Sequence, residues 1–264
     1  MDSLHNFSAI LPRFGFRFGR NSVHTARTFM LAELTALLEF TAAAPLPPAA
    51  YRAAVIDQNC LAKRSDSNRR LTFDYLRELY ALDDAVPLFR ALRTLWPRDP
   101  AGRPLLALLC AAARDPLLRA TAPLVLGLAP DAPLPRADTE AFLDALEPGR
   151  FSPATLKSTA QAVNGTWTTA GFLRGKAHKF RARAAPTAGA CAFALFLGHL
   201  TGERGLLLFE SEFVRLLDCP AEQALALAEL AAHRGWMNFR RVGSVVEASF
   251  PGWLTPAEEA SLHG

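Results

Sequence analysis

The sequence predicts a mainly α-helical protein whose strands are short β-hairpins confined to its C-terminal half. Apolar residues recur at helical spacing along most of the chain, in segments bounded by Pro, Gly, Ser or Asp. No run before residue 171 is assigned as a strand, so the first half is expected to be all-helical. Gly171 and Gly235 each end a helical stretch, and a pair of short strand-like runs follows each of them.

Helices in the first part of the chain are separated by prolines and acidic caps. Asp66, for example, is expected to cap the third helix, and Pro45, Pro47 and Pro48 end the first. The expected helices span residues 22–43, 48–65, 66–82, 84–95, 104–113, 116–126 and 138–146.

A longer helix is expected over residues 153–170. Ser152 can cap it, Pro153 suits its first position, and Gly171 suits a left-handed residue after its end. One apolar stripe would face the core, and a neighbouring polar stripe can form hydrogen bonds outward. The apolar stripe is Leu156, Ala160, Val163, Trp167 and Ala170; the polar stripe is Lys157, Gln161, Asn164 and Thr168. Whether Asn164-Gly165 breaks this helix is left open.

The next residues form two strand-like runs, 172–174 and 178–183, about a turn at 175–177. A helix followed by a basic hairpin is typical of a winged helix-turn-helix, in which the helix enters the major groove. The alternative is a solvated amphipathic helix with a basic loop. Charge favours the first interpretation: residues 148–202 hold seven Lys or Arg and no Asp or Glu. Basic side chains of one sign suit a phosphate backbone, because each neutralised phosphate releases counterions.

A second unit of the same kind is expected in the C-terminal part. Helices are predicted at 188–200, 211–217 and 220–233, and strands at 236–241 and 244–250. The helix before this hairpin carries Glu222 and Glu229 and no base before Arg234, which argues against groove insertion. Arg240 and Arg241 could touch phosphate, but packing or protein contact is the favoured role. Four segments are therefore expected: a basic, aromatic arm (1–20), a helical domain (21–135), a winged-helix-like DNA-binding unit (136–186) and a helical or winged-helix-like unit (187–264).

The arm alternates Arg13, Arg17 and Arg20 with Phe14, Phe16 and Phe18. Such a pattern suits an arm that tracks a nucleic-acid backbone, DNA or RNA, with rings that stack or wedge. It equally suits a segment that packs its phenylalanines on the body, and that interpretation is favoured.

Catalytic and membrane signatures are missing from the sequence. None of the common phosphate-loop, nucleophile-elbow or zinc-helix motifs occurs, so neither an enzyme nor a cofactor or metal site is expected. The four cysteines lack metal-ligand spacing and are expected as free thiols. No signal peptide is recognisable, and the apolar runs fall short of the roughly 20 residues of a membrane span, so a cytoplasmic protein is expected.

Residues 55–76, VIDQNCLAKRSDSNRRLTFDYL, resemble the early signature of the BrxA family of BREX bacteriophage-resistance systems. The matching positions are Asn59, Leu61, Lys63, Arg64, Ser65, Arg69 and Arg70. Later segments are also similar: an apolar DPLLR helix, an acidic helix, and a Ser-Pro start to a helix ending in Ala-Gly-Phe-Leu. The likeness covers about residues 25–200. It implies a mostly helical, non-enzymatic protein that binds double-stranded DNA, with other BREX proteins as further candidate partners.

Two hypotheses follow. The first is a non-catalytic double-stranded DNA-binding protein with weak sequence preference, whose contacts are Lys157, Gln161, Asn164, Thr168, Arg174, Lys176, Lys179, Arg181 and Arg183. Secondary contacts could come from Arg13, Arg17, Arg20, Lys63, Arg64, Arg69 and Arg70, although the last four surround a helix junction and are favoured in a structural role there. The second is a scaffold protein that binds other defence proteins through its basic and acidic faces.

Overall fold

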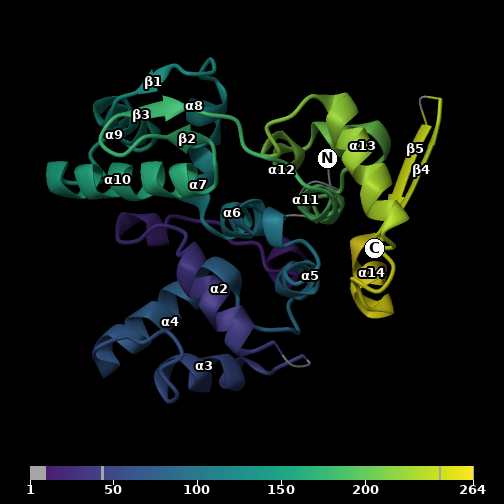
Figure 1. Cartoon of the computed structure of the whole chain (residues 1–264), viewed down its shortest axis with the longest axis horizontal. Helices are drawn as coiled ribbons and strands as arrows, with labels where there is room; N and C mark the ends of the chain where they lie inside the picture. Colours follow the sequence, from purple (N-terminus) through teal and green to yellow (C-terminus); the bar gives the residue numbers. More distant parts are fainter. Residues whose placement is uncertain (1–9, 43–44, 244, 264) are drawn as a thin grey trace. The chain divides into compact units, whose positions relative to one another are not determined.

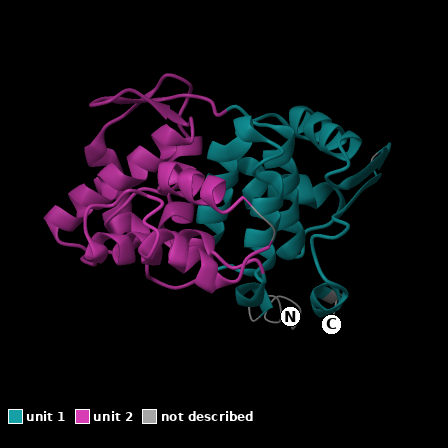
Figure 2. Ribbon diagram, turned by 60° about the horizontal axis from the view of Figure 1, so that its bottom comes forward, with its two compact units in different colours: residues 1–17, 85–113, 185–264 teal, residues 18–84, 114–184 magenta. Residues whose placement is uncertain are grey.

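The computed structural model describes residues 10–42, 45–243 and 245–263. Within these ranges it contains thirteen α-helices, several 3-10 turns and two small antiparallel sheets, which confirms the mainly α class (Figure 1). The chain groups into two compact units (Figure 2). Unit 1 comprises Met1–Arg17, Ala85–Ala113 and Ala185–Gly264, and unit 2 comprises Phe18–Asp84 and Arg114–Ala184. Each unit is made of stretches that are separated in the sequence, whereas four consecutive segments were expected from the sequence. One expected boundary, after residue 186, lies close to the boundary between the two units after residue 184.

Unit 2 holds most of the expected site. Its elements are η2 (Val23–Thr25), α2 (Leu31–Phe40), α3 (Pro48–Ile56), α4 (Asp66–Tyr80), α7 (Pro116–Ala120), α8 (Ala122–Leu126), β1 (Pro133–Leu134), α9 (Arg136–Leu146), α10 (Pro153–Thr169), β2 (Leu173–Arg174) and β3 (Lys179–Arg181).

Three of the expected helices of unit 2 are shorter or divided. The first begins only at Leu31, because residues 23–25 form a 3-10 turn and Met30 has a left-handed φ of 54°. The second ends at Ile56, and the helix expected over 116–126 is split at Thr121 into α7 and α8. Ser65, not Asp66, caps α4: its hydroxyl accepts the N–H of Asn68 at 3.2 Å.

The sheet of unit 2 has three strands in the order β1-β3-β2, all antiparallel. The β2–β3 hairpin was expected, but β1 was not, so the expectation of an all-helical first half is wrong at this point. Pro133 pairs with Phe180 and Leu134 with Lys179. A two-residue strand is too short to leave an alternating pattern in the sequence.

Helix α10 follows the expected pattern closely. The Ser152 hydroxyl accepts the N–H of Thr155 at 3.2 Å, Pro153 opens the helix, and Gly171 has a φ of 92° just after its end. The helix is continuous through Asn164-Gly165. Trp167 lies buried at the end of the apolar stripe, and its indole N–H donates to the Thr121 hydroxyl at 2.9 Å.

A buried polar network joins α10 to the start of unit 2. The carboxylate of Asp115 accepts hydrogen bonds from the Ser22 hydroxyl at 2.8 Å, the Val23 N–H at 2.9 Å and the Leu118 N–H at 3.1 Å. It also faces His24 Nδ1 at 2.9 Å, and since a carboxylate only accepts, Nδ1 is the donor. His24 Nε2 lies 2.9 Å from the hydroxyl of Thr166 on α10. The same hydroxyl accepts the Phe29 N–H at 3.0 Å.

Unit 1 is built around α11 (Ala188–Leu200). Of its thirteen residues all but His199 are buried, as the apolar sequence led us to expect. The remaining elements are η1 (Leu11–Phe14), α5 (Pro87–Leu95), η3 (Pro100–Gly102), α6 (Arg103–Arg114), η4 (Gly205–Glu210), α12 (Glu212–Arg215), α13 (Ala221–His233), β4 (Asn238–Val242), β5 (Val245–Ser249) and α14 (Pro256–His263).

Asp99 anchors the start of α11. Its Oδ2 accepts the Thr187 hydroxyl at 2.5 Å and the Gly189 N–H at 2.9 Å. A Cβ on Gly189 would lie 2.4 Å from the same oxygen, so the position requires glycine. Helices α12 and α13 pack on α11, and the antiparallel β4–β5 hairpin follows α13 (Figure 1). The expected second helix–helix–hairpin arrangement is therefore present.

We expect Asp115 to make the stability of the protein fall in acid. Burial alone would raise the pKa of Asp115, but attraction to His24 and the hydrogen bonds from His24, Leu118 and Ser22 lower it to about 2. The stabilisation is therefore present above the ordinary carboxyl pKa of 3.8 and is lost as the pH falls through the folded pKa. It amounts to about 2 kcal/mol at neutral pH.

Urea unfolding of the wild type and Asp115→Asn, followed between about pH 5 and about pH 2, measures this contribution. The free energy of unfolding of the variant should change less over this range. Parallel curves for the two proteins would contradict the assignment.

Candidate nucleic-acid interface

Most exposed side chains of α10 lie between its start and Gln161, and the last residue of the helix, Thr169, is exposed as well. Lys157, Ser158 and Gln161 are exposed, whereas Val163, Asn164 and Trp167 are buried. Helix α9 and the turn η2 pack on α10; in its second half, Thr139 of α9 contacts Asn164 and His24 of η2 contacts Thr166. Recognition helices use their N-terminal residues to contact bases, so the exposed half is the suitable one.

The expected outward stripe is therefore only partly correct. Asn164 is 4% exposed, and its side-chain oxygen accepts the hydroxyl of Thr139 on α9 at 3.1 Å. Thr168 is half-buried and donates its hydroxyl to the Asn164 carbonyl one turn back at 2.6 Å. Asn164 joins two helices instead of facing a groove, and Thr168 is held by its own helix. Of the polar stripe, Lys157 and Gln161 face solvent.

The hairpin presents its cations unequally. Lys176 and Arg183 are exposed, and neither forms an ion pair with any residue that the structure describes. Arg174 is exposed too, but its guanidinium lies 2.9 Å from a carboxylate oxygen of Asp131. Lys179 is half-buried and donates to the Gly175 carbonyl at 2.7 Å, and burial lowers its pKa.

Arg181 corrects another expectation, because it is buried at 4% exposure. It lies on β3, the central strand, and its guanidinium donates to the carbonyls of Phe172, at 3.4 Å, and of Ala182. The guanidinium carbon also lies 5.7 Å from the centre of the Phe172 ring. Arg181 is therefore a structural side chain of the sheet and has no access to a phosphate.

The stretch without acids along the sequence has acids beside it in space. Asp131, before β1, pairs with Arg174, and Glu147, after α9, pairs with Arg150. Helix α9 packs on α10 and carries the exposed Asp138. A cationic surface remains at Lys157, Lys176 and Arg183, but it is narrower than the charge of residues 148–202 suggested.

Most of the secondary contacts are engaged in structural bonds. Lys63 lies 3.0 Å from Glu33, and Arg70 lies 2.6 Å from Asp66. Arg69 donates to the carbonyl of Ile56, the last residue of α3, at 2.8 Å. Such a contact is the helix-end interaction that was favoured from sequence. Arg64 is exposed.

In the N-terminal arm, residues 1–9 lie outside the described part. Phe14 and Phe16 are buried at 1% and 2% exposure, as the favoured packing interpretation predicts, while Phe18 is 51% exposed. Arg13 is exposed, Arg17 is half-buried, and Arg20 donates from Nε to Glu147 at 2.7 Å.

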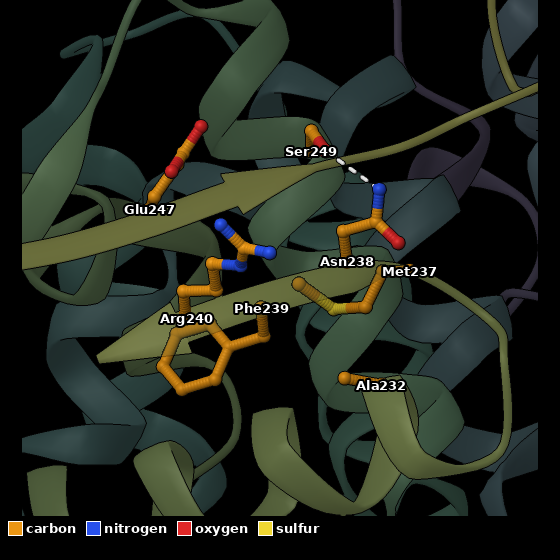
Figure 3. Close-up of a pocket in the computed structure, with 7 residues that line it drawn as sticks. All are labelled: Ala232, Met237, Asn238, Phe239, Arg240, Glu247 and Ser249. Carbon is orange, nitrogen blue, oxygen red and sulfur yellow. Dashed lines mark hydrogen bonds between the residues drawn. The ribbon is translucent and has the colours of Figure 1, made fainter. Parts of the chain in front are cut away.

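The second hairpin carries a pocket of about 390 Å³ (Figure 3). Its lining is Ala232, Met237, Asn238, Phe239, Arg240, Glu247 and Ser249. Asn238 and Ser249 are joined across the strands by a hydrogen bond of 3.2 Å. Nearby, the exposed Arg241 lies 3.5 Å from Glu222 on α13. Both acidic and basic side chains lie on this surface, and α13 itself carries no Lys or Arg. These features do not favour insertion of α13 into a DNA groove.

Within the described ranges, no group of three or more His, Cys, Asp or Glu side chains is placed to hold a metal ion. Helices long and apolar enough to cross a membrane are missing from the same ranges. The four cysteines are free thiols, as expected.

The buried Asp115–His24–Thr166 network is the feature that sequence reasoning missed. His24 and Asp115 are 91 residues apart, and Thr166 is 142 residues from His24, so no spacing signal links them.

No protein-family model, curated protein or solved structure matches the chain.

Substitutions of Arg181, in β3, and Arg183, two residues after it, should distinguish a buried structural cation from an exposed one. We expect Arg181→Ala to lower the free energy of unfolding by about 2–4 kcal/mol, because it removes a buried side chain with its packing on Phe172 and its hydrogen bonds to the carbonyls of Phe172 and Ala182. Arg183→Ala should change it by less than about 0.5 kcal/mol. Denaturant unfolding of both variants tests this, and equal effects would contradict the placement of Arg181.

Proposed function

We propose that unit 2 is a double-stranded DNA-binding module of the winged-helix kind. The first half of α10 would enter the major groove, and the β2–β3 hairpin would contact the phosphate backbone. The observation that carries the proposal is the joint exposure of Lys157 and Gln161 on the helix with Lys176 and Arg183 on the hairpin that follows it.

The order of elements supports this assignment. Helix α9 and helix α10 are followed directly by the hairpin, and β1, which precedes both helices, completes the sheet in the order β1-β3-β2. This order holds the hairpin against the end of α10, since β2 also packs on that helix. A helix and a hairpin held in this way suit the groove and the adjacent backbone together.

The exposed face of α10 offers only Lys157 and Gln161 for contacts to base edges, so we expect a weak preference for DNA sequence. Gln161 can form a bidentate pair with adenine, and Lys157 can bond guanine. Lys176, Arg183 and the exposed Arg174 would hold phosphates, which set register but carry no sequence information. Asn164 and Arg181 are excluded from the contact set because both are buried.

We further propose that the protein acts without catalysis in a BREX-type anti-phage system. The support is the BrxA-like pattern from Asn59 to Arg70, which lies at the junction of α3 and α4. In that role, DNA binding by unit 2 would bring the other defence proteins to a duplex.

The test is the salt dependence of binding to a random duplex, measured by fluorescence anisotropy. The double variant Lys176→Ala and Arg183→Ala should flatten the slope of log affinity against log salt by up to about two units. Its matched control is Arg52→Ala with Arg77→Ala, two exposed arginines on α3 and α4 of the same unit, which should leave the slope unchanged.

An equal change in the two double variants would reject the hairpin as the contact. No duplex binding at low salt would reject the proposal as a whole and favour a scaffold protein.

A further inference from the structure

Phe18 is an aromatic side chain held on the surface in a defined setting. It is 51% exposed, although Phe14 and Phe16 in the same Arg/Phe run are buried. A single exposed apolar side chain is common and indicates nothing alone. Here, however, the guanidinium carbon of Arg119 lies 5.4 Å from the centre of the ring. The ring therefore has a cation over it and about half of its surface open.

The segment that follows the ring is fixed to the start of α10. Arg20 donates from Nε to Glu147 at 2.7 Å, and Arg150 donates to the carbonyl of Arg20. The guanidinium of Arg150 also lies over Phe151, 4.6 Å from the centre of its ring. Arg20, two residues after the ring, is thereby tied to Glu147 and Arg150, which lie just before the cap of α10.

Arg119, whose guanidinium lies over the Phe18 ring, belongs to a helix that packs near the start of α10. Arg119 is on α7, and Leu117 of that helix packs in a small core with Leu143 of α9 and Ala160 of α10. Phe151, just before the cap of α10, and Leu156, in its first turn, pack against this core. The Phe18–Arg119 pair consequently stands on the elements that support the exposed half of α10.

An aromatic ring backed by a guanidinium is suited to one class of ligand, a nucleobase. Every base has a flat face that stacks on aromatic rings and on guanidinium planes, in a largely sequence-independent way. Bases paired within a duplex already stack on their neighbours, so the ring can take only a base that is unpaired or has left the stack.

We propose that Phe18, backed by Arg119, is a stacking site for an unpaired nucleobase beside the duplex held by α10. The stacking site rests on the proposed function, DNA binding by unit 2, and specifies the preferred DNA. That DNA carries a bulged or extruded base next to a double-stranded segment.

The experiment compares two duplexes of equal length, one perfect and one with a single unpaired adenine near its centre. The wild type should bind the bulged duplex about tenfold more tightly, a factor within the range measured for base–aromatic stacking. Phe18→Ala should abolish this preference while leaving the affinity for the perfect duplex unchanged, and Phe18→Trp should retain it.

The chain offers a matched control in Phe40 at the end of α2. Its ring is 55% exposed, and no arginine of the described ranges lies over it. Phe40→Ala should keep the full preference for the bulged duplex. Equal affinity of the wild type for both duplexes, or an equal loss in Phe18→Ala and Phe40→Ala, would overturn the stacking site. Failure to bind either duplex would overturn the proposed function with it.

Discussion

The carboxylate of Asp115 holds together the parts of unit 2 on which the candidate interface stands. It caps α7, fixes the 3-10 turn at residues 23–25, and orients His24 toward Thr166 of α10. An ionised group at 2% exposure is tolerated only because four donors surround it. The network holds Thr166 in the second half of α10, and Thr139 of α9 holds Asn164, whereas Lys157 and Gln161 remain exposed.

The sequence predicted the local elements of the interface well, because their signals are local. Ser152, Pro153 and Gly171 mark the ends of α10, and the turn after Gly175 marks the hairpin. The direction of individual side chains was less predictable. Asn164 is polar and sits beside Gln161 on the helix, yet Thr139 from α9 buries it. Arg181 is buried against Phe172 and bonded to backbone carbonyls, a contact that the basic sequence of the hairpin does not reveal, and the two-residue strand β1 is too short to leave an alternating pattern.

Charge was also easier to count along the chain than to place in space. The stretch from 148 to 202 contains no acid, but Asp131 and Glu147 come from just outside it and pair with Arg174 and Arg150. Among the cations at the α3–α4 junction, Lys63, Arg69 and Arg70 make contacts within the protein, in line with the structural role favoured from the sequence. The number of Lys and Arg residues in an acid-free segment is therefore an upper limit on the number that can contact a polyanion.

The interleaving of the two units sets an order for synthesis on the ribosome. Unit 2 is complete once residue 184 has been made, whereas α5 and α6 of unit 1 await α11, which begins at Ala188. Some 70 residues separate the end of α6 from that point, about 4–14 s of translation. During this interval α5 lacks α11, the helix on which it packs. Chains stopped before residue 188 are therefore expected to expose the apolar residues of α5 that α11 covers in the complete protein.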